Sequence, residues 1–170
     1  MGIWRTWDSE GSVRGGSNPH LVTAADYKNA SSYVFHREQM FPKLADKGSE
    51  DPAVYRDAKG RYHALFHNMF PCPNYPCPEV AGAHAFSEDG VRWNYTGVAW
   101  DSTGHYNDGT PFAFFRRERP HPVMAADGTS IVALSTGVEY RDKTTAGTDA
   151  TFTFLQPVQT AASASASASA

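Results

Sequence analysis

Apolar and polar residues alternate along short segments of this chain, with the period of two that is typical of β-strands. In RYHALFH, residues 61–67, Tyr62, Ala64 and Phe66 share one face, and the residues between them share the other. The segment AVYRDAKG before it, residues 53–60, supplies a short apolar strand and a turn that ends in glycine. Together the two segments predict an antiparallel hairpin around a half-buried strand.

The same hairpin pattern recurs twice further along the chain. GAHAF, SEDG and VRWNYTGV cover residues 82–98, and HPVMA, ADGT and SIVALSTGV cover residues 121–138. Each turn ends in a glycine that can take the positive φ required there: Gly60, Gly90 and Gly128. No long segment has helical periodicity, and 11 prolines and 14 glycines interrupt the rest. The pattern therefore predicts an all-β chain of repeated antiparallel hairpins.

A longer repeat favours a β-propeller over a sandwich or a barrel. SEDPAVYRDAKGRYHALFH (residues 49–67) and RERPHPVMAADGTSIVALS (residues 117–135) both read as an acidic residue, one residue, proline, strand, glycine turn and strand. A closed propeller has about 4–8 blades, whereas this chain holds roughly two clear blades plus partial strands. We therefore expect an incomplete propeller over residues 1–158, belonging to a longer protein, a diverged remnant or an assembly. An open arc exposes sheet edges and predicts self-association.

Composition and charge narrow the class of partner. The net charge of −3 gives no reason to expect binding to nucleic acid or to an anionic membrane, and no apolar run reaches the roughly 18 residues of a membrane span. The Ala/Ser-rich residues 159–170 predict a disordered tail. Cys72 and Cys77, together with the glycosylation sequons at Asn29 and Asn94, favour a secreted protein with a short disulfide. The N-terminus does not resemble a signal peptide, so a cytoplasmic chain with two free thiols stays open.

Three segments resemble the blade motifs of the five-bladed propeller glycosidases: EDPAVYRDAKGRYHALFH, GAHAFSEDGVRW and RRERPHPVMAADGT. These enzymes are the arabinanase, levansucrase and invertase superfamily, including glycoside hydrolase families 43 and 32. The resemblance covers residues 49–158. It implies hydrolysis of an oligo- or polysaccharide by three carboxylates in a central funnel: a base or nucleophile, an orienting aspartate and a glutamate general acid.

The resemblance assigns two of these three carboxylates. Asp51 matches the orienting aspartate, and Glu118 matches the general acid, although Arg119 stands where the family usually has glycine. No residue matches the base, since Asn18 offers only an amide. Glycoside cleavage needs one group to protonate the leaving oxygen and another to activate water or attack the sugar. A chain without the base would be a fragment of the enzyme, or a carbohydrate-binding propeller without activity.

Five further residues are predicted to bind substrate, namely Glu50, His63, His84, Arg117 and His121. Structural alternatives stay open for them: a turn cap for Glu50, and backbone hydrogen bonds for the histidines. Glu118 has one too, as half of a Glu–Arg pair at the start of a blade. Strand alternation predicts that Arg117 and Arg119 face away from Glu118.

No cofactor or metal is predicted. His63 and His67 lie four residues apart, which on a strand separates them by about 13 Å, too far to share an ion. In SEDGVRW, Ser87 and Asp89 are expected to bind backbone amides while Trp93 packs between sheets, which is a structural role. The aromatic residues of the segment 101–117 form either a sugar-stacking platform or part of the core: Tyr106, Phe112, Phe114 and Phe115. A protein-interaction propeller with structural carboxylates is a third alternative.

Overall fold

The structure is a computed structural model, and it describes residues 2–7, 17–40, 49–68, 82–106, 108–140 and 150–158. In these residues the chain forms twelve β-strands and a single 3₁₀ turn, Ala30–Ser32. All strand pairs are antiparallel, so the predicted all-β class is confirmed. None of the described segments forms a helix with the length and apolarity that a membrane span requires. Cys72, Cys77 and the tail 159–170 lie outside the described residues.

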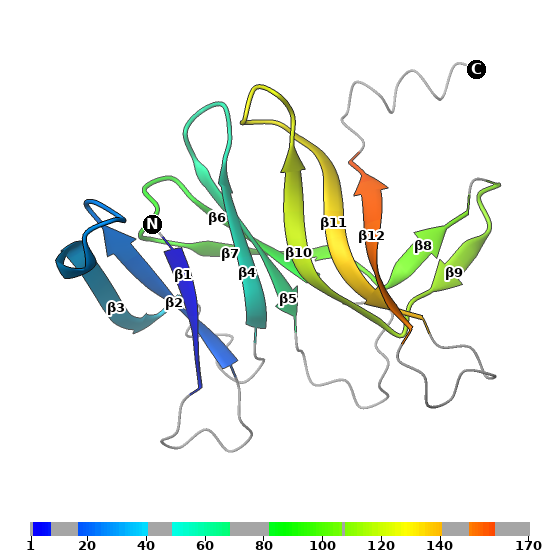
Figure 1. Ribbon diagram of the computed structural model, residues 1–170, viewed down its shortest axis with the longest axis horizontal. Helices are drawn as coiled ribbons and strands as arrows, with labels where there is room; N and C mark the ends of the chain where they lie inside the picture. The colour runs from blue at the N-terminus through cyan, green and yellow to red at the C-terminus, as the bar shows by residue number, and fades with distance from the viewer. Residues whose placement is uncertain are drawn as a thin grey trace.

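The strands form three meanders and one small hairpin (Figure 1). The N-terminal sheet contains β1 (Gly2–Trp7), β2 (Ser17–Ala24) and β3 (Tyr33–Gln39). The central sheet contains β4 (Ser49–Arg56), β5 (Tyr62–Asn68), β6 (Gly82–Ser87) and β7 (Asn94–Trp100). The C-terminal sheet contains β10 (Arg116–Met124), β11 (Ile131–Glu139) and β12 (Thr151–Pro157). The hairpin contains β8 (Thr103–His105) and β9 (Pro111–Ala113).

The first strands of the three sheets lie next to one another. β4 contacts β1 and β2 of the N-terminal sheet, and β10 contacts β4 and β5 of the central sheet. Each first strand therefore meets the first two strands of the sheet before it. In Figure 1 the central sheet accordingly lies between the other two.

Strand β5 is buried on both faces, rather than on one face as its alternation predicted. Ala64 and Phe66 pack with the partly buried Met40, which follows β3, whereas Leu65 lies in a second cluster with Leu134 of β11. The prediction of a half-buried strand was wrong because a sheet packs against each face. Apolar side chains at even and odd positions of β5 both leave water, and that burial stabilises the stack of sheets.

The three predicted hairpin turns form as expected. Their glycines have φ values of 78°, 77° and 67°: Gly60, Gly90 and Gly128. In each turn one aspartate side chain accepts two backbone N–H groups: Asp57, Asp89 and Asp127. These bonds hold the pKa of Asp89 and Asp127 below its ordinary value, while the pKa of Asp57 is lowered first by the Arg61 side chain and then by the backbone N–H groups.

Candidate functional site

The repeated Glu-X-Pro sequences build the same bulge in two neighbouring strands. Asp51 of β4 and Arg119 of β10 both have φ 53°, and they are the only non-glycine residues with positive φ in the described part of the chain. The strand register shifts between Glu50 and Ala53, and again at the equivalent place in β10. The proline that follows has no N–H to continue the ladder, which favours a bulge at this point. The repeated sequence therefore has the same backbone conformation in both strands.

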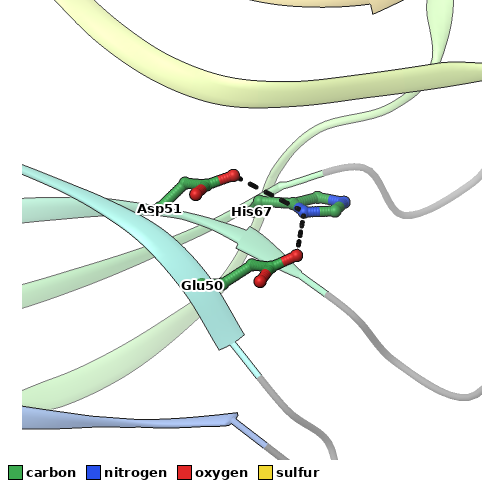
Figure 2. Close-up of side chains that lie close together, drawn as sticks. All are labelled: Glu50, Asp51 and His67. Carbon is green, nitrogen blue, oxygen red and sulfur yellow. Dashed lines mark ion pairs between the residues drawn. The ribbon is translucent and has the colours of Figure 1, made fainter. Parts of the chain in front are cut away.

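The bulge in β4 brings two consecutive carboxylates to one histidine. In a regular strand, neighbouring side chains point to opposite faces. Here the Nδ1 atom of His67 in β5 lies 3.4 Å from Oε1 of Glu50 and 4.0 Å from Oδ2 of Asp51. Figure 2 shows the two carboxylates approaching the same ring nitrogen. The three ligand atoms lie within 4.8 Å of one another, and we call this group the Glu50–Asp51–His67 cluster.

The cluster is largely shielded from water. The side chains are 13%, 29% and 15% exposed for Glu50, Asp51 and His67. The Nδ1 atom of His67 is buried and makes no hydrogen bond within the described residues. Sequence reasoning missed His67 as a site residue because it compared this histidine only with His63 on the same strand. Counting residue pairs outward from the turn would have placed it opposite Glu50 or Asp51.

A hollow of about 490 Å³ lies between β4 and β10, next to this cluster. The two bulged corners face each other across it, with residues 51–54 on one wall and residues 119–122 on the other. Asp51 therefore lies at one side of the hollow, and Arg119 and His121 lie at the other. Of the predicted site residues, the structure brings Asp51 and His121 together here.

Glu118 lies in a smaller adjoining hollow of about 120 Å³, and Arg119 lines both hollows. The Glu118 carboxylate is 3.0 Å from Nη1 of Arg119 and 4.0 Å from Nη1 of Arg116. Arg116 is in turn 3.4 Å from the carboxylate of Glu139. The prediction that Arg119 faces away from Glu118 was wrong, because the left-handed backbone of the bulge turns its side chain back. The structural Glu–Arg pair that was the alternative for Glu118 is present.

Arg117 faces away from Glu118, as alternation predicted, and ties together the C-terminal sheet. It is 2% exposed, and its guanidinium donates to Oγ1 of Thr136, the carbonyl of Asp101 and Oε1 of Gln156, at 3.2, 3.1 and 2.7 Å. Burial lowers the pKa of this side chain. All three guanidinium nitrogens are thus engaged inside the protein. Arg117 lines neither hollow, and the substrate-binding role predicted for it stays a prediction.

His63 and His84 belong to a chain of hydrogen bonds in the central sheet. Neither residue borders either of the two hollows. Nε2 of His63 is 3.2 Å from Oδ2 of Asp57, and its Nδ1 is 3.0 Å from Nε2 of His84. Nδ1 of His84 is 2.6 Å from Oγ1 of Thr96. Burial lowers the pKa of His84, and the charge on His63 lowers it further. The two histidines therefore have side-chain partners within the sheet, and the sugar contact predicted for them stays a prediction.

The aromatic residues near the β8–β9 hairpin belong mainly to the core. Phe114 is 2% exposed, and its ring contacts the rings of Phe112, Phe152 and Phe154. Tyr106 is 56% exposed and lies against Phe112. Of the two alternatives, core packing therefore describes Phe114, and only Tyr106 presents most of its surface to solvent.

The structural role predicted for the SEDGVRW turn is confirmed. The hydroxyl of Ser87 accepts the N–H of Gly90, and Asp89 accepts those of Val91 and Arg92. The indole N–H of Trp93 donates to the carbonyl of Gly90, and its ring packs against the core of the central sheet. These side chains hold the β6–β7 hairpin.

Comparison of the chain with models of protein families, with curated proteins and with solved structures finds no match. The glycosidase resemblance therefore rests on the short blade motifs alone. What the site does has to be argued from its geometry.

Proposed function

We propose that the three sheets are successive blades of a propeller arc. The support is the repeated contact between first strands: β4 meets β1 and β2, and β10 meets β4 and β5. Each sheet is an antiparallel meander, which is the architecture of a propeller blade. The last strands of the N-terminal and C-terminal sheets also expose apolar side chains: Tyr33, Val34 and Phe35 on β3, and Phe152 and Leu155 on β12. Such an arc associates with additional blades or with a second copy.

The hollow between β4 and β10 binds a carbohydrate. The observation that carries this proposal is the pairing of the two bulged corners across one space of about 490 Å³, within the ~300–1,000 Å³ typical of ligand pockets. A sugar presents hydroxyls, which both donate and accept hydrogen bonds, together with C–H faces. Asp51 supplies an acceptor, and Arg119 and His121 supply donors. Prolines and short aliphatic side chains between them offer surfaces for the C–H faces.

Glycoside hydrolysis is the second candidate function. The resemblance to five-bladed propeller glycosidases supplies the residue roles: Asp51 would orient the sugar, and Glu118 would protonate the leaving oxygen. The observation that favours it is that Arg119 lines both the hollow that Asp51 lines and the smaller hollow that Glu118 lines. Because the Glu118 carboxylate already pairs with two arginines, we rank carbohydrate binding above hydrolysis.

Calorimetry with a panel of neutral and acidic oligosaccharides, followed by an aryl glycoside assay, tests both proposals. We expect Asp51→Asn and His121→Ala to weaken binding at least tenfold, while the exposed turn variant Glu88→Gln keeps wild-type affinity. Equal binding by all three variants would contradict a sugar site in this hollow. Turnover that is lost in Glu118→Gln, with binding retained, would establish hydrolysis. Turnover that survives that substitution unchanged would remove Glu118 from the acid role.

A further inference from the structure

We propose that the Glu50–Asp51–His67 cluster binds a divalent transition-metal ion, with Zn²⁺ as the ion of best fit. This inference goes beyond carbohydrate binding, and it rests only on the three side chains and their surroundings. The sequence predicts no metal here. The carboxylates beside His67 lie on the paired strand β4, whereas the sequence prediction considered only a second histidine on the same strand.

The ligand set selects the class of ion. Imidazole nitrogen and carboxylate oxygen are both zinc donors, and catalytic zinc centres use three protein ligands and keep one position open. Hard cations such as Ca²⁺ prefer an all-oxygen shell of about 6–8 ligands, which three side chains with one nitrogen do not supply. Imidazole suits Zn²⁺, Co²⁺ and Ni²⁺, and the carboxylates balance the charge of a divalent ion.

The distances fit an ion better than they fit hydrogen bonds. Hydrogen bonds from a ring nitrogen to a carboxylate oxygen are about 2.7–3.2 Å long. Two ligands that each lie about 2.0–2.2 Å from one ion, at a tetrahedral angle, are roughly 3.3–3.6 Å apart. The Nδ1–Oε1 distance between His67 and Glu50, 3.4 Å, falls in that second range. The 4.0 Å from Nδ1 to Oδ2 of Asp51 is longer than this range, so Asp51 would have to move closer to bind the same ion.

The buried nitrogen of His67 points to the same conclusion. Its Nδ1 has no hydrogen bond within the described residues, although the atom is buried between two carboxylates. A polar atom left in that state is costly unless a proton or a metal ion joins it to the neighbouring oxygens. Asp51 also lines the hollow between β4 and β10, so an ion held by the cluster would lie beside that space.

Titration of the full-length chain, stripped of metal by a chelator, tests the site with Zn²⁺ and with Co²⁺. We expect one ion per chain. His67→Ala should weaken binding by more than about 100-fold, because loss of a residue that merely supports a ligand already costs about 10–100-fold. Affinity should fall as the pH is lowered, since protons compete for the ligand atoms. Visible Co²⁺ absorption should show nitrogen and oxygen ligands.

Asp51→Arg is the variant that separates loss of the site from loss of the fold. Arg119 already occupies the equivalent bulge with the same φ of 53°, so the backbone accepts arginine there. This variant should unfold near the wild-type denaturant concentration and bind no metal. Glu118→Gln, at the matched position in β10, and His121→Ala should both bind Zn²⁺ within about twofold of wild type.

Three results would overturn the proposal. The first is equal Zn²⁺ affinity in wild type, His67→Ala and Asp51→Arg. The second is an intense near-ultraviolet Co²⁺ band, which would assign the ion to thiolates of Cys72 and Cys77. The third is no binding at neutral pH, which would make the occupant of the cluster a proton. Sugar binding measured in the presence of chelator fails or succeeds independently of these outcomes.

Discussion

Gly82→Ala tests how the core of the central sheet is built. Gly82 lies in β6, and the indole ring of Trp100 in β7 covers it. A Cβ atom at this position would lie 1.8 Å from the nearest ring atom, whereas real Cβ contacts stay above 3.0 Å. The ring must therefore move by at least 1.2 Å (3.0 − 1.8) to admit one methyl group. Trp100 is 7% exposed and packs against Leu65, so it has little room to move.

The expected loss of stability follows from that displacement. Overpacking a core costs about 1–3 kcal/mol, and complete loss of a buried tryptophan costs about 3–5 kcal/mol. Replacing glycine in a strand returns about 0.5–1 kcal/mol, because the unfolded chain becomes less flexible. If the ring loses its packing, the tryptophan cost less that gain lowers the free energy of unfolding of Gly82→Ala by about 2–4.5 kcal/mol (3 − 1 to 5 − 0.5).

Urea unfolding of Gly82→Ala and Gly137→Ala makes the test, because the second glycine is a matched control. At Gly137 in β11 an added Cβ would have its nearest neighbour 3.8 Å away, an ordinary contact, so that variant should be unchanged or more stable by about 0.5–1 kcal/mol. In a Trp100→Ala background, Gly82→Ala should cost almost nothing, which gives a large coupling energy. Equal stability of the two glycine variants would refute the packing argument.

Three further predictions concern the assignments of single side chains. Arg117→Met should lower the free energy of unfolding by about 2–4 kcal/mol in urea, because it leaves buried acceptors unpaired, and should leave metal affinity unchanged; a change confined to ligand binding would restore its predicted role. Phe114→Ala should cost about 3–5 kcal/mol and Tyr106→Ala less than about 0.5 kcal/mol, and equal losses in thermal melts would contradict the core assignment. Hydrogen bonds from backbone N–H groups lower the pKa of Asp127 to about 2 and that of Asp89 below its usual value of 3.8. The unfolded chain therefore binds protons first, so the stabilisation from these turns should be complete above about pH 5, and stability in urea melts should fall as the pH drops from there toward 2; stability that rises over this interval would contradict the turn geometry.

The hairpins could be predicted from the sequence because their signals are local. A two-residue period fixes a strand, and an Asp–Gly turn fixes where it reverses, so the segments 53–67, 82–98 and 121–138 all form the predicted hairpins. The β8–β9 hairpin was not predicted, since strands of three residues carry no measurable alternation. The N-terminal sheet was expected only as partial strands, because its apolar residues do not alternate clearly.

The side-chain geometry at the bulges could not be derived from alternation. A residue with φ 53° reverses the side-chain direction that a regular strand dictates, and nothing in Glu-X-Pro alone requires that conformation. Arg119 was therefore assigned to the wrong face, while Glu50 and Asp51 were treated as competitors for one inward position. In the structure both carboxylates reach His67, so the choice between them does not arise.

The two corners differ at the residue in the bulge, and that difference decides what each corner does. With arginine at position 119, the guanidinium turns back 3.0 Å from Glu118 and neutralises its own corner. With aspartate at position 51, the same backbone adds a second negative charge beside Glu50, and both carboxylates lie next to His67. Left-handed conformations of such residues cost about 1–2 kcal/mol each, so neither bulge is explained by local preference. The same left-handed conformation therefore occurs on two facing strands. On β4 it gives the hollow a wall that attracts cations, and on β10 it gives a wall whose charges are already paired.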